Sequence, residues 1–115
     1  MSLNVKTRKV DNVVIVDMSG RLTAGEPVLM LRETIRVHVN DGARSLILNL
    51  GEVSYIDSSG LGELVSAYTT VRNKQGDVKL LNLTSKAKDL LQMTKLLTVF
   101  DVYDNEAKAL AALNK

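Results

Sequence analysis

The chain has 115 residues, of which 45% are hydrophobic and 24% charged, so one globular domain with a buried core is expected over residues 1–115. The net charge of +2 is too small to indicate a nucleic-acid or membrane-surface partner, and the lack of cysteine excludes disulfides and cysteine metal sites. No signal-peptide core and no apolar stretch near the ~20 residues of a membrane helix occurs, so we expect a cytoplasmic protein without membrane insertion.

The first part of the chain predicts a β-hairpin followed by a helix. Residues 3–10 alternate between apolar and polar side chains, and residues 13–18 are rich in β-branched residues, which is typical of paired strands. We expect Gly20 to end the second strand. After a loop, Pro27 suits the first helical position, where its missing N–H leaves no hydrogen bond unmade, and Gly42 suits the C-terminal stop.

The rest of the chain alternates between strands and helices. Three apolar or β-branched runs predict strands over residues 46–50, 78–83 and 98–102. Three amphipathic segments predict helices that begin at the serine pair Ser58-Ser59, at Thr84 or Ser85, and at Asp104. The first of them is expected to run to about Lys74, with Gly76 as its cap.

The resulting order is β-β-α-β-α-β-α-β-α, which predicts an α/β domain whose mixed sheet is largely parallel after the opening hairpin. Polar residues interrupt the centres of three apolar runs, at Asp17, Asn49 and Asn82. If these strands share a register, one face of the sheet is only partly covered and the helices crowd the other face.

The sequence offers little for catalysis. His38 is the single histidine, so a Ser-His-Asp triad would need it, and its place in an amphipathic helix favours a position at the helix rim. One histidine without cysteine gives no zinc site, and the Gly60-Leu61-Gly62 segment lacks the spacing of a phosphate-binding loop. We therefore expect no metal, no cofactor and no enzymatic activity.

The segment Asp57-Ser58-Ser59-Gly60-Leu61-Gly62 lies between the apolar strand and the next amphipathic helix. One interpretation is structural: an acid or hydroxyl caps the helix, and the glycines allow close packing of strand and helix. The other is functional: a serine at a helix N-terminus and at the carboxyl edge of the sheet is accessible to a partner or a kinase. The free N–H groups and the helix dipole there can accommodate a phosphate.

The Asp-Ser-Ser-Gly-Leu-Gly segment, in this order of elements and with the Gly20-Arg21-Leu22 turn, resembles anti-sigma-factor antagonists, the small bacterial STAS-domain proteins. The resemblance implies partner switching: the chain binds an anti-sigma factor that is also a serine kinase, is released on phosphorylation of Ser58, and is reset by a phosphatase. Ser59 is the second candidate for the acceptor.

The same resemblance implies that residues 57–62, together with Arg21 and Thr23, contact the partner. Many antagonists have an Asp where this chain has Thr23, so the loop is less acidic here. The alternative is a non-catalytic STAS module of a signalling scaffold or lipid-transport assembly, in which the serine turn serves packing. A third hypothesis, an enzyme or small-ligand binder at the sheet edge, has no motif in its favour.

Overall fold

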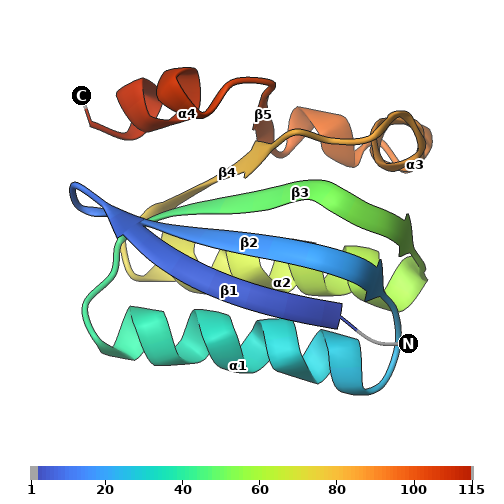
Figure 1. Cartoon of the computed structure of the whole chain (residues 1–115), viewed down its shortest axis with the longest axis horizontal. Helices are drawn as coiled ribbons and strands as arrows, with labels where there is room; N and C mark the ends of the chain where they lie inside the picture. Colours follow the sequence, from blue (N-terminus) through green and yellow to red (C-terminus); the bar gives the residue numbers. More distant parts are fainter. Residues whose placement is uncertain (1–2, 115) are drawn as a thin grey trace.

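The computed structural model describes residues 3–114, which form a five-stranded sheet with four α-helices in the predicted order (Figure 1). The strands are β1 (Leu3–Val10), β2 (Val13–Leu22), β3 (Ser45–Ile56), β4 (Asp77–Leu81) and β5 (Asp101–Tyr103). The helices are α1 (Glu26–Asn40), α2 (Ser58–Asn73), α3 (Ser85–Met93) and α4 (Glu106–Leu113), with a 3₁₀ turn over Leu96–Thr98. The predicted α/β fold class is confirmed.

The strands follow one another in the sheet in the order β1-β2-β3-β4-β5. The β1–β2 hairpin is antiparallel and the other three pairs are parallel, so the sheet is mixed as predicted. The pairing of β3 with β2 extends to Ile56 opposite Leu22, whereas its pairing with β4 ends at Asn49 opposite Leu81. Among the described residues 3–114, residues 50–56 of β3 therefore have a neighbouring strand on one side only.

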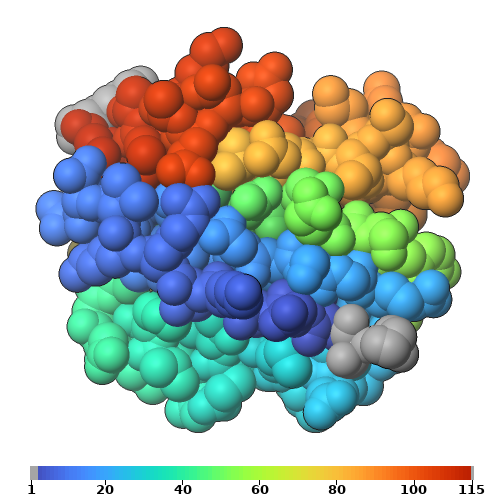
Figure 2. Space-filling model, viewed as in Figure 1, coloured from blue at the N-terminus to red at the C-terminus, as the bar shows by residue number. Residues whose placement is uncertain are grey.

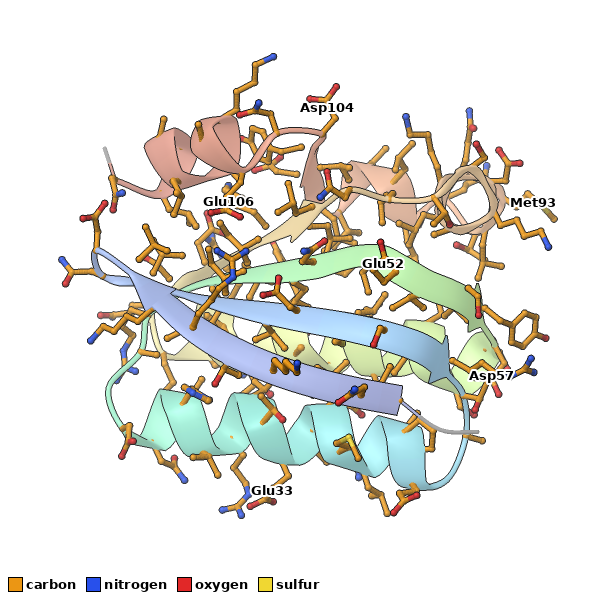
Figure 3. The ribbon with its side chains drawn as sticks, in the orientation of Figure 1. Glu33, Glu52, Asp57, Met93, Asp104 and Glu106 are labelled. Atoms are coloured by element: carbon orange, nitrogen blue, oxygen red, sulfur yellow. The ribbon has the colours of Figure 1, made fainter. Side chains whose placement is uncertain are left out.

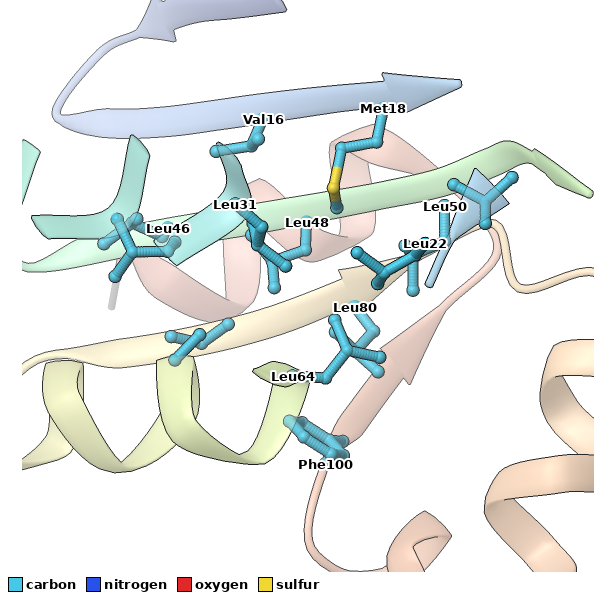
Figure 4. Close-up of a cluster of buried hydrophobic side chains, with 14 of the residues drawn as sticks. Val16, Met18, Leu22, Leu31, Leu46, Leu48, Leu50, Leu64, Leu80 and Phe100 are labelled. Atoms are coloured by element: carbon cyan, nitrogen blue, oxygen red, sulfur yellow. The ribbon is translucent and has the colours of Figure 1, made fainter. Parts of the chain in front are cut away.

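The main core lies between one face of the sheet and helices α1 and α2. Alternate residues of the central strands point into it, among them Val16, Leu48 and Leu80, because successive side chains of a strand face opposite ways (Figure 4). Four apolar residues of α1 recur at helical spacing and form one face of the helix, and all four are buried: Val28, Leu31, Ile35 and Val39. Burying each such side chain contributes about 1.5–3 kcal/mol, which fixes both helices on the sheet.

The opposite face of the sheet is covered only in part, as predicted. Helix α4 packs there through Ala109 against Ile15 and Ile47, and side chains of β1, β2 and β3 stay at the surface between α1 and the C-terminal helices (Figure 2). On the uncovered part, the Asn49 amide donates to the Asp17 carboxylate at 2.8 Å. The three polar interruptions come together, since the Asn82 amide lies 3.4 Å from the Asn49 oxygen.

An arginine links helix α4 to the hairpin. Arg8 Nε lies 2.6 Å from Asp17 Oδ2, and Arg8 Nη2 lies 2.7 Å from Glu106 Oε1 at the start of α4 (Figure 3). The guanidinium is therefore shared by two carboxylates from elements far apart in the sequence. Both carboxyl groups have lowered pKa values, chiefly because of the hydrogen bond from Arg8.

Several predicted boundaries were wrong. Strand β2 continues through Gly20, whose φ of 106° accompanies a register shift, because pairing with β3 continues on its far side. Helix α1 begins at Glu26, one residue before Pro27. The strand expected over 78–83 ends at Leu81, and Asn82 takes a left-handed φ of 61°.

The last predicted elements also shift. Most of the segment expected as a strand over 98–102 is a 3₁₀ turn and its exit, and β5 comprises only Asp101–Tyr103. Asn105 rather than Asp104 caps α4, and its side chain accepts from the Lys108 N–H at 3.0 Å. Thr84 does cap α3, as one of the two alternatives predicted.

The glycine after α2 has a different function from the one predicted. Gln75 holds the left-handed conformation, with a φ of 67°, while the N–H of Gly76 donates to the Val71 carbonyl at 2.9 Å. A Cβ at Gly76 would lie 2.3 Å from the carbonyl oxygen of Arg44, so glycine is needed there for close approach of two backbones.

Among the described residues, no helix has both the length and the apolar character needed to cross a membrane.

Candidate functional site

The candidate site is the corner where β3 ends and α2 begins. Asp57 is the N-cap of α2, and its Oδ1 accepts from the N–H of Gly60 at 2.8 Å. Ser58 and Ser59 are the first two residues of the helix, and both are exposed. Because the acid caps the helix, neither serine hydroxyl is needed for capping and both face the surroundings.

Asp57 also joins the helix to the loop between β2 and α1. Its Oδ2 accepts from the N–H of Ala24 at 3.0 Å, and its own N–H donates to the Leu22 carbonyl at 3.3 Å. The hydrogen bond from Ala24, followed by that from Gly60, lowers the pKa of the Asp57 carboxyl. A carboxylate is therefore held beside the serines at neutral pH, at the carboxyl end of the sheet (Figure 3).

The two glycines of the segment differ in what they do. A Cβ at Gly60 would lie 2.1 Å from the Leu22 carbonyl oxygen, so only glycine lets the first turn of α2 sit against the end of β2. The predicted close packing is confirmed at this position. Gly62 is exposed, and a Cβ added to it would have no neighbouring atom within 4 Å, so the same expectation is wrong there.

The end of β2, which carries Arg21, and the loop after it, which carries Thr23, border the serine corner. Arg21 is opposite Tyr55 across the β2–β3 pair, and its guanidinium carbon lies 4.8 Å from the centre of the Tyr55 ring. Thr23 is half-buried and precedes Ala24, whose N–H binds Asp57. The structure thus brings both residues to the predicted site, but Arg21 lies in β2 rather than in the predicted loop, because β2 stays paired with β3 as far as Leu22.

Leu61 lies in the same segment but faces inward. Its side chain is 6% exposed and belongs to the main core, so it fixes α2 to the sheet. The surface that a partner can touch at this corner is therefore made by the serines, Gly62 and the loop, and Leu61 supports it from below.

A shallow groove of about 480 Å³ between α1 and α2 continues from the corner. Ser59 and Gly62 lie along one side of it, and Arg32 on the other side makes an ion pair with the buried Glu63 at 2.9 Å. Sequence reasoning missed this pair. The signal was present, because Glu63 is the one acid at helical spacing among the buried residues of α2.

The remaining polar candidates from the sequence are His38 and the acidic side chains. His38 Nδ1 lies 2.9 Å from the Thr34 carbonyl of its own helix, which is the rim position predicted for it. Over residues 3–114, no group of three or more histidine, cysteine or acidic side chains is placed to hold a metal ion.

Comparison with known proteins gives one consistent family. Residues 4–109 match the family described as the STAS domain. The anti-sigma-B factor antagonist of Bacillus subtilis is 33% identical over 103 residues, which cover 89% of this chain and 92% of that protein.

Three solved structures, of two proteins, show the same fold. A protein of Thermotoga maritima, described as a candidate anti-sigma factor antagonist, has a TM-score of 0.90 at 24% identity, covering 96% of this chain and 95% of its own. The Bacillus antagonist SpoIIAA, at 22% identity, has TM-scores of 0.74 in its unphosphorylated form and 0.75 in its phosphorylated form. The unphosphorylated form covers 96% of this chain and 98% of its own, and the phosphorylated form covers 95% and 98%.

Proposed function

The chain belongs to the STAS domain family, and from this premise we propose that it is an anti-sigma factor antagonist that works by partner switching. In this proposal the β3–α2 corner binds an anti-sigma factor that is also a serine kinase. Phosphorylation of Ser58 ends the complex, and a phosphatase restores it. The chain itself catalyses neither step and acts as the substrate of both enzymes.

The exposed Ser58 hydroxyl at the first position of α2 is the observation that carries the proposal. Asp57 caps the helix with one oxygen and binds the neighbouring loop with the other, so the serine oxygen is free for modification. A kinase can reach it without opening the core. Ser58 is favoured over Ser59 because it directly follows the acid, as in the family pattern that the sequence resembles.

The charge of a phosphate provides the switch. Phosphorylation adds about −1.5 to −2 charges at neutral pH, and the helix N-terminus can accommodate them. If a carboxylate of the partner came within about 5 Å, the repulsion would be roughly 3 kcal/mol per unit charge at an effective dielectric constant of about 20. A difference of this size weakens binding about a hundredfold while the domain stays folded.

Thr23 sets this chain apart from the more acidic family pattern, and the cation Arg21 lies nearby. Because residue 23 is neutral and Arg21 at the end of β2 carries a positive charge, the phosphate meets less repulsion from its own protein. Release then depends mainly on acidic groups of the partner. A partner for this chain is therefore expected to present carboxylates, rather than a neutral surface, to the corner.

The test uses the purified anti-sigma factor kinases encoded in the same genome. The chain is incubated with each kinase and ATP, and the phosphate is located by mass spectrometry. Phosphate on Ser58 and retention of one kinase by the unmodified chain support the proposal. If both serines stay unmodified and no kinase is retained, the proposal is wrong.

A further inference from the structure

A small groove lies beside the serine corner, between the end of β3 and helix α3. Its volume is about 220 Å³. Its floor and walls are mostly apolar and come from Val53, Tyr55, Ile56, Ala87 and Leu90. We call this feature the β3–α3 groove. One wall of the groove is the end of strand β3, which leads directly into Asp57 and Ser58.

The size of the groove limits what it can hold. Pockets for small-molecule ligands have volumes of about 300–1,000 Å³ and enclose most of the ligand. At about 220 Å³ the β3–α3 groove is smaller than this range, and it is open to solvent. It suits one or two aliphatic or aromatic side chains of another protein better than a cofactor or metabolite.

The strand that forms one wall also has a free edge. Strand β4 leaves β3 after Asn49, whereas β2 stays paired to Ile56. The N–H of Asp57 donates to Leu22 in β2, and main-chain groups of successive residues in a strand point to opposite edges. The N–H and C=O groups of Ile56, the residue before Asp57, therefore point away from β2, to the side where β4 has ended.

This edge has no partner strand within residues 3–114, although α3 lies nearby. A strand edge of this kind can bind an extended segment through the main chain, while adjacent pockets take alternate side chains. The β3–α3 groove provides such a pocket. The free edge of β3 and the β3–α3 groove together therefore suit an extended peptide segment that carries an apolar side chain.

The charge at the groove indicates the composition of that segment. Lys86 is the side chain among the lining residues that is charged at neutral pH, and it is exposed. An acidic residue in the segment would be attracted to it. Two peptide units separate Ile56 from Ser58, so their Cα atoms lie within about 7.6 Å, and a phosphate on Ser58 would meet the same segment.

We infer that the anti-sigma factor binds the β3–α3 groove with an extended acidic segment that places one apolar side chain between β3 and α3. This inference rests on the proposed function and names the part of the partner that phosphorylation repels. The groove provides affinity and Ser58 provides the switch. The two are neighbours on one strand, so a single segment can contact both.

The affinity of the purified anti-sigma factor kinase is measured by isothermal titration for the wild-type chain and for four variants. Lys86→Glu reverses the charge at the groove, and Tyr55→Ala removes an exposed part of its wall. Lys88→Glu is the matched control, because it makes the same charge change on α3 at an exposed residue outside the groove lining. Ser58→Asp reports on the switch separately.

We expect Lys86→Glu and Tyr55→Ala each to weaken binding about tenfold or more, as substitutions in a contact centre do, and Lys88→Glu to stay within about twofold. Thermal melting checks that the Tyr55→Ala variant is folded. If that variant is unfolded, Lys86→Glu gives the decisive result, because Lys86 is exposed. Wild-type affinity of both groove variants, with release of Ser58→Asp, would overturn the inference and leave partner switching in place. If no kinase binds the wild-type chain, both proposals are wrong.

Discussion

Replacing Gly60 by alanine tests whether the site depends on close contact between α2 and β2. The new Cβ would lie 2.1 Å from the Leu22 carbonyl oxygen and 2.9 Å from Leu22 Cγ, where ordinary contacts begin near 3.4 Å. The first turn of α2 would have to move away by more than 1 Å, or Leu22 would have to leave its buried position. Either change disturbs the loop that Asp57 binds.

Gly62→Ala is the matched control for this experiment. It lies in the same helix, has nothing within 4 Å of the added methyl group, and should gain about 0.5–1 kcal/mol from the higher helix propensity of alanine. Gly60→Ala has the same gain in propensity, but the overlap opposes it with the roughly 1–3 kcal/mol or more that overpacking costs. The gains cancel in the comparison, so the two variants should differ in free energy of unfolding by the overpacking cost alone, roughly 1–3 kcal/mol or more.

Urea unfolding followed by circular dichroism measures this difference, and thermal melting should show it as a gap of about 4 °C per kcal/mol. We expect Gly62→Ala to melt above the wild-type chain and Gly60→Ala to melt below it. If Gly60→Ala is as stable as Gly62→Ala, the packing of α2 against the end of β2 is not as described.

Two further predictions concern the ionic contacts. Arg8→Ala removes the shared partner of Asp17 and Glu106. Since Arg8 is partly exposed, we expect the free energy of unfolding to fall by only about 1 kcal/mol, and the amide hydrogens of α4 to exchange faster. Unchanged amide exchange in α4 would contradict the link between Arg8 and this helix. In the folded chain the pKa of Asp57 is lowered from its ordinary value of 3.8, so the unfolded chain binds the proton more readily. The stability that ionised Asp57 contributes is therefore present above pH 3.8 and is lost as the pH falls through the pKa of the folded chain. Asp57→Asn should therefore flatten the fall of the urea midpoint as the pH drops below about 4, and an unchanged slope would contradict the hydrogen bonds that Asp57 accepts.

The order of elements could be predicted because it depends on local patterns. The apolar spacing of α1 and the β-branched run of β2 each fit one kind of element only, and the structure confirms both. Asp17 and Asn49 also indicated the less covered face correctly, since a polar residue within an apolar strand has to find a partner or solvent.

The extent of the strands depends on pairing and was harder to predict. Residues 51–56 show no clean alternation, and they form part of β3 because β2 continues beside them to Leu22. The capping of α2 was predicted only as a choice among acid and hydroxyls. The capping residue Asp57 also accepts a second hydrogen bond, from the N–H of Ala24. This bond joins residues 33 positions apart and follows from the tertiary fold alone.

The groove beside the site has the same origin. Its two walls, the end of β3 and helix α3, come from separate parts of the chain. Its free strand edge exists because β4 turns away at Asn82, where the left-handed backbone interrupts what looked like a longer strand. No local pattern shows where a neighbouring strand ends, so this surface required the structure.

The most direct test compares the affinity of the anti-sigma factor kinase for the unmodified chain with its affinity for the chain phosphorylated on Ser58, with circular dichroism recorded for both. We expect superimposable spectra and about hundredfold weaker binding after phosphorylation. Equal affinity of the two forms, or loss of the folded spectrum on phosphorylation, would contradict this expectation.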